Sequence, residues 1–176
     1  APADRADDQI DRGALRDRWR ALQDVHDFRD MLIDLGVGRL QAFRLVGDDF
    51  AYRVEPGAFR QALEQAAAAA LPIMIFTGSP GVVQIHTGPV ERLKEVGPWF
   101  NVLDPGFNLH LREDGIAEAW VVRKPTRDGI VTSLEIYDAA GGQIAWMFGE
   151  RGEGKAERAD WRGLVEALPP QGVAGQ

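Results

Sequence analysis

The chain contains no cysteine, and this absence removes several classes of chemistry at once. Disulfides, zinc–thiolate sites, iron–sulfur clusters and thiol nucleophiles all need that side chain. The 176 residues include only three histidines, His26, His86 and His110, and their spacing does not match the H-x-H or H-x-x-x-H patterns of zinc sites. A histidine-based metal site therefore needs a group that brings most of its own ligands.

The sequence also lacks a long apolar run and a surplus of positive charge. The apolar stretch at 66–71 ends at Pro72, far short of the roughly 18 to 20 residues that span a bilayer. Residues 1–13 have no basic start or apolar core of a signal peptide, so we expect no membrane span and a cytoplasmic location. A net charge of −7 disfavours a nucleic-acid partner. The absent initiator methionine leads us to expect a fragment of a longer protein.

What is present is the composition of one soluble globular domain, with 45% apolar and 27% charged residues. We expect residues 1–13 to be a disordered lead or linker, residues 14–168 a single domain and residues 169–176 a fraying tail. No G-x-S-x-G elbow occurs. The segment 78–81 (GSPG) lacks the lysine of a phosphate loop and is interpreted as a hairpin turn.

Helical spacing dominates the first 70 residues, and strand-like alternation follows. Helices are predicted over 15–22, 24–36, 39–46, 58–70, 90–96 and 156–168. Strands are predicted over 50–54, 72–77, 82–87, 99–103, 107–112, 116–124, 130–137 and 143–148. Short Asp-Gly and Gly-Gly connections indicate antiparallel pairing. The predicted class is α+β: an antiparallel meander sheet of about six or seven strands, with N-terminal helices and a C-terminal helix packed on it.

The stretch 21–36 (ALQDVHDFRDMLIDLG) places one histidine apart from an apolar stripe. Asp24 is a good N-cap, Asp27 follows as an imperfect capping box, and Gly36 is the expected stop. The stripe does not need His26, which falls in the first turn, where its ring can face a ligand. Spacing alone still favours a structural role for a lone helical histidine, and His86 and His110 are also interpreted as structural side chains of strands.

One histidine is enough to bind haem, because the porphyrin supplies four nitrogens and the protein adds one axial imidazole. The two propionates would then need cations at the rim of the pocket. Candidates are Arg39 beside the first helices, Arg123-Lys124 at a strand end and Arg151 after the last strand. Each of these, taken singly, is at least as easily a solvated strand or helix end.

Three long blocks resemble the bacterial hemin-degrading factor family of cytoplasmic haem-trafficking proteins (the HemS/ChuS/PhuS type). They are IHTGPV at 85–90, GPWFNVLDPGFNLHL at 97–111 and WVVRKPTRDGIVTSLE at 120–135. The likeness extends upstream through DVHDF and downstream to FGERGEG. Family members usually have two similar halves, each an antiparallel sheet with packed helices, and this chain is similar to the second half alone.

The resemblance implies a role for each of several residues. His26 corresponds to the axial haem ligand, and Arg39, Lys124 and Arg151 match the family's basic pocket residues. Relatives use an arginine of the first half on the opposite haem face, which this chain does not supply. The sixth iron position would then hold water, a group from another subunit or Arg29, which follows His26 by three residues.

Two functions of different classes remain open, and a plain interaction domain without cofactor is a weaker third. The first is a haem carrier for iron acquisition that passes haem to a haem oxygenase. The second is an enzyme that opens the porphyrin with O2 and a reductant. Partners implied are haem, a receiving haem oxygenase, and the missing N-terminal half or a second copy in a homodimer.

Overall fold

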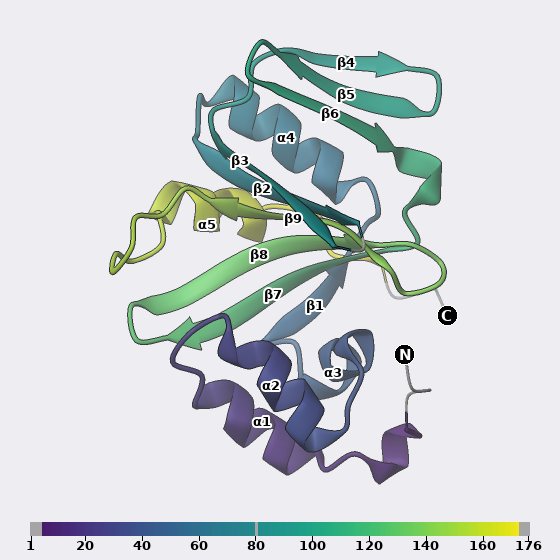
Figure 1. Cartoon of the computed structure of the whole chain (residues 1–176), viewed down its shortest axis with the longest axis vertical. Coiled ribbons are helices and arrows are strands. Elements are labelled where there is room, and N and C mark those ends of the chain that lie inside the picture. The colour runs from purple at the N-terminus through teal and green to yellow at the C-terminus, as the bar shows by residue number, and fades with distance from the viewer. Residues whose placement is uncertain (1–4, 80, 173–176) are drawn as a thin grey trace.

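A central antiparallel sheet divides the chain into layers in the computed structural model, which describes residues 5–79 and 81–172 (Figure 1). Its strands are ordered β1-β7-β8-β9-β2-β3. Their bounds are β1 Ala51–Val54, β2 Ile73–Ser79, β3 Val82–Gly88, β7 Glu118–Thr126, β8 Gly129–Tyr137 and β9 Gln143–Gly149. Three further strands form a separate antiparallel sheet: β4 Leu93–Val96, β5 Trp99–Asp104 and β6 Phe107–Arg112.

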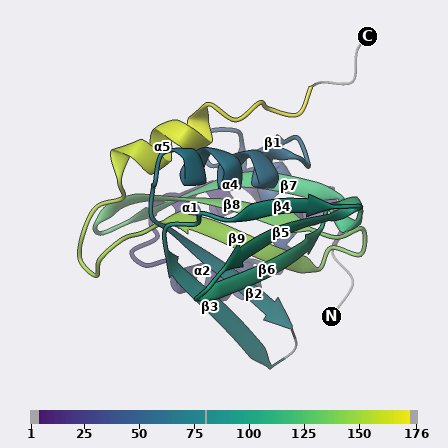
Figure 2. The ribbon, with the colours of Figure 1, turned by 90° about the horizontal axis from the view of Figure 1, so that it is seen from above.

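Helices cover the central sheet on both faces, but in different ways. The helices α1 (Arg12–Arg20), α2 (Asp27–Leu35) and α3 (Arg39–Val46) pack under β1 and β7, whereas α4 (Ala58–Ala68) and α5 (Ala159–Glu166) lie on the opposite side (Figure 1). Seen from above, the small sheet lies beside α4 and in front of the central sheet, and the β2–β3 hairpin projects outward (Figure 2). Two short 3-10 turns, Asp7–Gln9 and Glu113–Gly115, complete the chain.

Two apolar cores result, one on each face of the sheet. The larger is built from α4, α5, the small sheet and the inward residues of the central strands. The smaller surrounds Trp19, which contacts Phe28 at 4.8 Å and Phe43 at 6.2 Å between ring centroids and donates its indole N–H to the carbonyl of Arg123 at 2.7 Å. Because this indole is both buried and hydrogen-bonded, it anchors the N-terminal helices to β7.

The predicted α+β class, with N-terminal helices and a C-terminal helix on an antiparallel sheet, is confirmed. The strands, however, divide between two sheets. Strands follow one another as in a meander in β7-β8-β9 and β2-β3 of the central sheet and in β4-β5-β6 of the small sheet. The predicted helix at 90–96 is wrong. Leu93–Val96 pairs as strand β4 with β5, because Gly97 has a φ of +57° and allows a tight turn before Trp99.

The N-terminal lead also differs from the expectation where it is described. Asp11 caps α1 by accepting a hydrogen bond from the backbone N–H of Ala14 at 2.9 Å, so residues 12 and 13 are already helical. Ile10 is buried in the smaller core. Among residues 5–79 and 81–172, no helix is both long and apolar enough to span a bilayer. The proposed turn at 78–81 joins β2 to β3, although Pro80 lies outside the described residues.

Candidate functional site

His26 stands at the start of α2 with its imidazole in solvent. Its side chain is 92% exposed, and its backbone N–H donates to the carboxylate of Asp24 at 2.8 Å. In the opposite direction, the Asp27 carboxylate accepts a hydrogen bond from the backbone N–H of Asp24 at 3.1 Å. The helix itself begins at Asp27, two residues later than an Asp24 cap requires, and His26 is the N-cap residue. Gly36 ends the helix as predicted, at a φ of +62°.

A cavity of about 210 Å³ lies beside this imidazole. It opens where β8 and β9 diverge, because their pairing ends at Leu134 and Met147 while each strand continues. Its walls are mostly apolar; the lining residues are Val25, His26, Met74, Phe76, Val131, Phe148, Gly149, Arg151 and Glu157. The structure thus brings His26 and Arg151 to one cavity, with the exposed ring at its mouth.

Beyond the cavity, an apolar floor continues across the uncovered half of the sheet. Cross-strand pairing puts Trp146, Phe76 and Ile85 in one row on the face that the N-terminal helices cover elsewhere. Phe76 stacks on Trp146 at 5.5 Å and 7°, and meets Phe148 edge-on at 5.5 Å. Ile85 remains 60% exposed. An exposed apolar surface of this kind is typical of a site that binds a protein, a membrane or a ligand.

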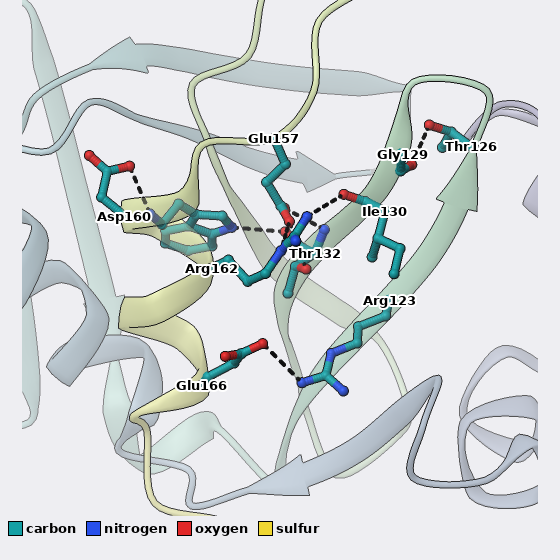
Figure 3. A network of polar contacts seen from close by, with 10 residues as sticks. Arg123, Thr126, Gly129, Ile130, Thr132, Glu157, Asp160, Arg162 and Glu166 are labelled. Carbon is teal, nitrogen blue, oxygen red and sulfur yellow. Dashed lines mark hydrogen bonds and ion pairs between the residues drawn. The ribbon is translucent and has the colours of Figure 1, made fainter.

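Arg151 is positioned by a loop that a buried carboxylate fastens to the sheet. The guanidinium lies 3.6 Å from Asp128 and donates to the carbonyl of Lys155 at 3.2 Å. Glu157, only 4% exposed, accepts from the backbone N–H of Thr132 at 2.5 Å and from its hydroxyl at 3.0 Å (Figure 3). It therefore takes the place of the strand partner that β8 loses when β9 turns away.

Packing behind this loop is tight. Arg162 of α5 donates to the Glu157 carboxylate at 3.2 Å, which leaves that carboxylate paired as well as hydrogen-bonded (Figure 3). A Cβ added at Gly149 would come within 2.6 Å of the Trp161 side chain, so glycine is required for α5 to approach the end of β9. The cavity floor is thus rigidly backed by α5.

Arg39 and Lys124 lie together at a second position, around the buried carboxylate of Glu135. Lys124 Nζ and Arg39 Nη1 are each 3.8 Å from a Glu135 oxygen. Both cations also lie over the ring of Phe28, at 4.3 Å and 5.1 Å from its centroid. Neither residue lines the His26 cavity, but Lys124 is the cross-strand partner of Val131, which does. The two groups of cations are therefore neighbours on one face.

Burial changes the acid–base properties of this cluster. Burial raises the pKa of Glu135, but Lys124, then Arg39 and the hydrogen bonds of Tyr137 and Ser133, lower it by more, so the carboxylate stays ionised. Burial lowers the pKa of Lys124 below its usual value, and Glu135 partly offsets that effect. The Tyr137 pKa is raised, chiefly by burial and then by the charge of Glu135.

The remaining candidates lie apart from this arrangement. Arg29 is exposed on α2, and the structure gives it no special surroundings. His86 stacks on Phe107 at 4.0 Å, and its Nε2 has no hydrogen-bond partner among the described residues. His110 is held by Asn101 through a 2.7 Å hydrogen bond, in keeping with the predicted structural role.

A second, larger cavity of about 550 Å³ lies on the outer face of the small sheet. His110 and Lys94 line it together with Trp99, so this cavity also places an imidazole beside a cation. It differs from the His26 site in having one aromatic side chain instead of an aromatic floor. Because the surroundings of the histidines differ, substituting each in turn can show which of them binds a ligand.

Two buried carboxylates near the candidate site were not predicted from the sequence. Glu135 sits in the buried run 131–137, where both faces of the strand are covered and alternation gives no sign of a special position. Glu157 falls in the polar first turn of the helix predicted over 156–168, where a carboxylate looks solvated, whereas α5 begins only at Ala159. A charged residue inside an otherwise buried strand was the one available signal for Glu135.

A family model and the curated relatives that match this chain point to the same kind of protein. The model of the haemin-degrading HemS/ChuX domain matches residues 36–168, which includes Arg39, Lys124 and Arg151 but not His26. The hemin transport protein HmuS of Yersinia pestis is 44% identical over 164 residues, covering 93% of this chain and 48% of that protein. The chain therefore spans about half the length of the curated relatives it matches.

Solved structures agree with this comparison. PhuS, a heme-binding protein from Pseudomonas aeruginosa, is 50% identical with a TM-score of 0.95, over 97% of this chain and 50% of that one. The heme degrading enzyme ChuS of Escherichia coli O157:H7 is 46% identical with a TM-score of 0.89, over 97% and 50%. On the strength of both sequence and fold, the chain belongs to the haemin-degrading HemS/ChuX family.

Proposed function

We propose that this chain binds haem through the imidazole of His26 and acts as a carrier that takes up and releases it. The observation that supports this most directly is a fully exposed imidazole at the mouth of a cavity whose apolar floor runs out over Phe76 and Trp146. The HmuS and PhuS relatives are named for hemin transport and heme binding.

The residues present fit a porphyrin. An apolar floor that includes aromatic side chains suits a large apolar ring, and the 210 Å³ cavity alone is smaller than the roughly 300–1,000 Å³ of pockets that enclose a drug-sized ligand. The open floor is therefore needed to support the rest of the ring. The haem brings an iron with four ring nitrogens, so that a single side chain of this protein completes the attachment.

Three basic side chains near the cavity support binding of the two haem propionates. Arg151 lies in the cavity, and Arg39 and Lys124 lie on the same face around Glu135. Charge-assisted hydrogen bonds from such groups are about twice as strong as neutral ones, and they orient a planar ligand that the apolar floor alone would let rotate. Arg29 lies three residues after His26 on nearly the same helix face, so this spacing does not by itself support a role on the opposite side of the ring.

The carrier function is favoured over degradation by the openness of the site. A degrading enzyme has to hold O2 among donors and to restrict water. Here the axial side chain is 92% exposed, and Val83 and Ile85 on the outer strand are about 60% exposed. Degradation remains the second candidate, since the ChuS relative is described as a heme degrading enzyme.

A hemin titration followed in the Soret region tests the proposal. We expect saturable one-to-one binding that weakens by at least tenfold, with a changed spectrum, in His26→Ala. His110→Ala is the matched control, because it removes the other exposed histidine, and should bind as the parent does. An unchanged spectrum and affinity in His26→Ala would remove the assignment.

The two candidate functions are separated by adding a reductant and O2 in the presence of catalase. A carrier returns its haem intact to an acceptor such as apomyoglobin, whereas a degrader releases iron and an open tetrapyrrole. Sustained turnover that survives catalase would favour the enzyme.

The physiological setting is proposed on the same grounds. We place the chain in cytoplasmic iron acquisition, with a haem oxygenase as receiver and with the other half of a longer protein or a second copy as partner. Light scattering with and without hemin, and transfer kinetics to a haem oxygenase, measure these two associations separately.

A further inference from the structure

The cluster around Glu135 contains more charge than a buried structural network needs. Glu135 is 1% exposed and Lys124 6% exposed, while the Arg39 side chain is 33% exposed. One carboxylate thus faces two cations within 3.8 Å, which leaves one positive charge uncompensated. Burying ionised groups costs several kcal/mol each unless they are paired and hydrogen-bonded, so an unbalanced cluster calls for an explanation.

Hydrogen bonding in the cluster is divided unequally. Glu135 accepts from Tyr137 at 2.6 Å, from Ser133 at 2.7 Å and from Gln143 at 2.9 Å. Both cations stand at 3.8 Å, beyond hydrogen-bond length. Three neutral donors therefore fix the carboxylate, and the N–H donors of Lys124 and Arg39 are not used up by it.

The cluster is also next to the floor of the haem site. Glu135 is the cross-strand partner of Trp146, which stacks on Phe76, and Lys124 is the partner of Val131 in the cavity wall. The ring of Phe28, two residues after His26, lies against both cations. A carboxylate on a ligand lying over this floor would meet the half-exposed end of the cluster.

From this geometry we propose that Glu135 is a positioning residue for the haem carboxylates: it holds Lys124 and Arg39 ionised and in place, with a single positive charge left for one carboxylate of the ligand. This inference rests on the proposed function, and it assigns to Glu135 a role that acts through the two cations. Without Glu135, buried Lys124 would face only Arg39 across the cluster and would favour its neutral form. The titratable groups that face Lys124 among the described residues are Glu135 on β8 and Arg39 on α3.

The test compares hemin with hemin dimethyl ester, whose carboxylates are blocked, from pH 6 to pH 9. In the parent chain we expect the preference for hemin over the ester to change less than threefold. In Glu135→Gln the preference should fall about tenfold as pH rises, because Lys124 loses its proton. Glu135→Asp, which keeps the charge, should restore the flat profile.

Glu118→Gln is the matched control, since Glu118 is a partly buried carboxylate on the neighbouring strand that pairs with Arg53 instead. It should follow the parent profile. A parallel profile in the parent and in Glu135→Gln, or the same loss in Glu118→Gln, would overturn the inference. If the parent itself fails to bind hemin, the proposed function fails instead, and the two failures are distinguishable.

A measurement on the parent chain keeps the inference open to refutation if Glu135→Gln does not fold. The side-chain carbon resonance of Lys124, assigned by its loss in Lys124→Met, reports the protonation of that amine without any ligand. It should show the charged form at pH 7.5. A neutral Lys124 at that pH contradicts the proposal.

Discussion

One face of the central sheet is covered along half of its width and open along the other half. Over β1 and β7, the helices α1–α3 bury Trp120 and Val122 together with Trp19 and Phe43. Over β9, β2 and β3, the same alternation leaves Phe76 half-buried and Ile85 60% exposed. The local sequence patterns are alike, and the difference lies in what covers them.

The covered half of the sheet contributes mainly to stability, and the open half is available for binding. Apolar side chains under the helices contribute their burial to folding, at about 25 cal/mol per Å² removed from water. Those on the open half contribute less to folding and remain free to bury a ligand. The boundary between the halves runs beside His26 and the Glu135 cluster, which is where an axial ligand and its cations are needed.

The largest effect is expected in the covered half. Trp19→Ala removes a fully buried ring and its hydrogen bond to Arg123, and should lower the free energy of unfolding by about 3–5 kcal/mol. Urea denaturation followed by circular dichroism measures it. A loss below about 1 kcal/mol would show that the N-terminal helices are not tied to the sheet as described.

On the open half of the sheet, a substitution should weaken hemin binding more than it lowers the free energy of unfolding. Phe76→Ala removes a half-buried ring from the floor, and we expect about a tenfold loss of hemin affinity, which corresponds to about 1.4 kcal/mol. The free energy of unfolding should change by about 1 kcal/mol or less. Equal losses of stability in Phe76→Ala and Trp19→Ala would erase the distinction between the halves.

At the boundary, a charge effect of intermediate size is expected. Arg151→Gln keeps much of the side-chain volume but removes a cation from the cavity, so hemin affinity should fall about fivefold while hemin dimethyl ester affinity stays the same. The comparison of the two ligands in one titration series measures this. A similar loss for both ligands would mean that Arg151 supports the loop and does not contact a carboxylate.

The smallest effect is on the pH dependence of stability. The pKa of Glu135 in the folded chain lies below its usual value, so its contribution is complete above about pH 4.5 and is lost as pH falls through the folded pKa. Between pH 5 and pH 3, the parent should lose stability more steeply than Glu135→Gln. Urea midpoints at four pH values suffice, and identical slopes would contradict an ionised Glu135 in the folded chain.

Much of the fold was predictable because its signals are local. The caps and stops of the helices depend on a few neighbouring residues, as with Gly36, and the Asp-Gly connections fix the β7–β8 hairpin. The division into two sheets was not predictable. Whether β4 continues the main sheet depends on packing of distant segments on α4, which no local pattern encodes.

The candidate site divides in the same way. An isolated histidine at a helix start is visible in the sequence, and its exposure follows from the apolar stripe of α2 on the other side. The burial of Lys124 is not visible, because it depends on Phe28 and Glu135 coming together from α2 and β8. Lys124 at a strand end therefore looked like a rim residue, although the structure buries it beneath the N-terminal helices.

The axial role of His26 is tested most directly by pulsed electron paramagnetic resonance of the hemin complex prepared with 15N-labelled histidine. The chain has only three histidines, so single substitutions assign the signal. We predict a 15N hyperfine coupling to the iron that disappears in His26→Gln and persists in His86→Gln and His110→Gln. A coupling that survives in His26→Gln and is lost in His110→Gln would move the haem to the small sheet and contradict the account.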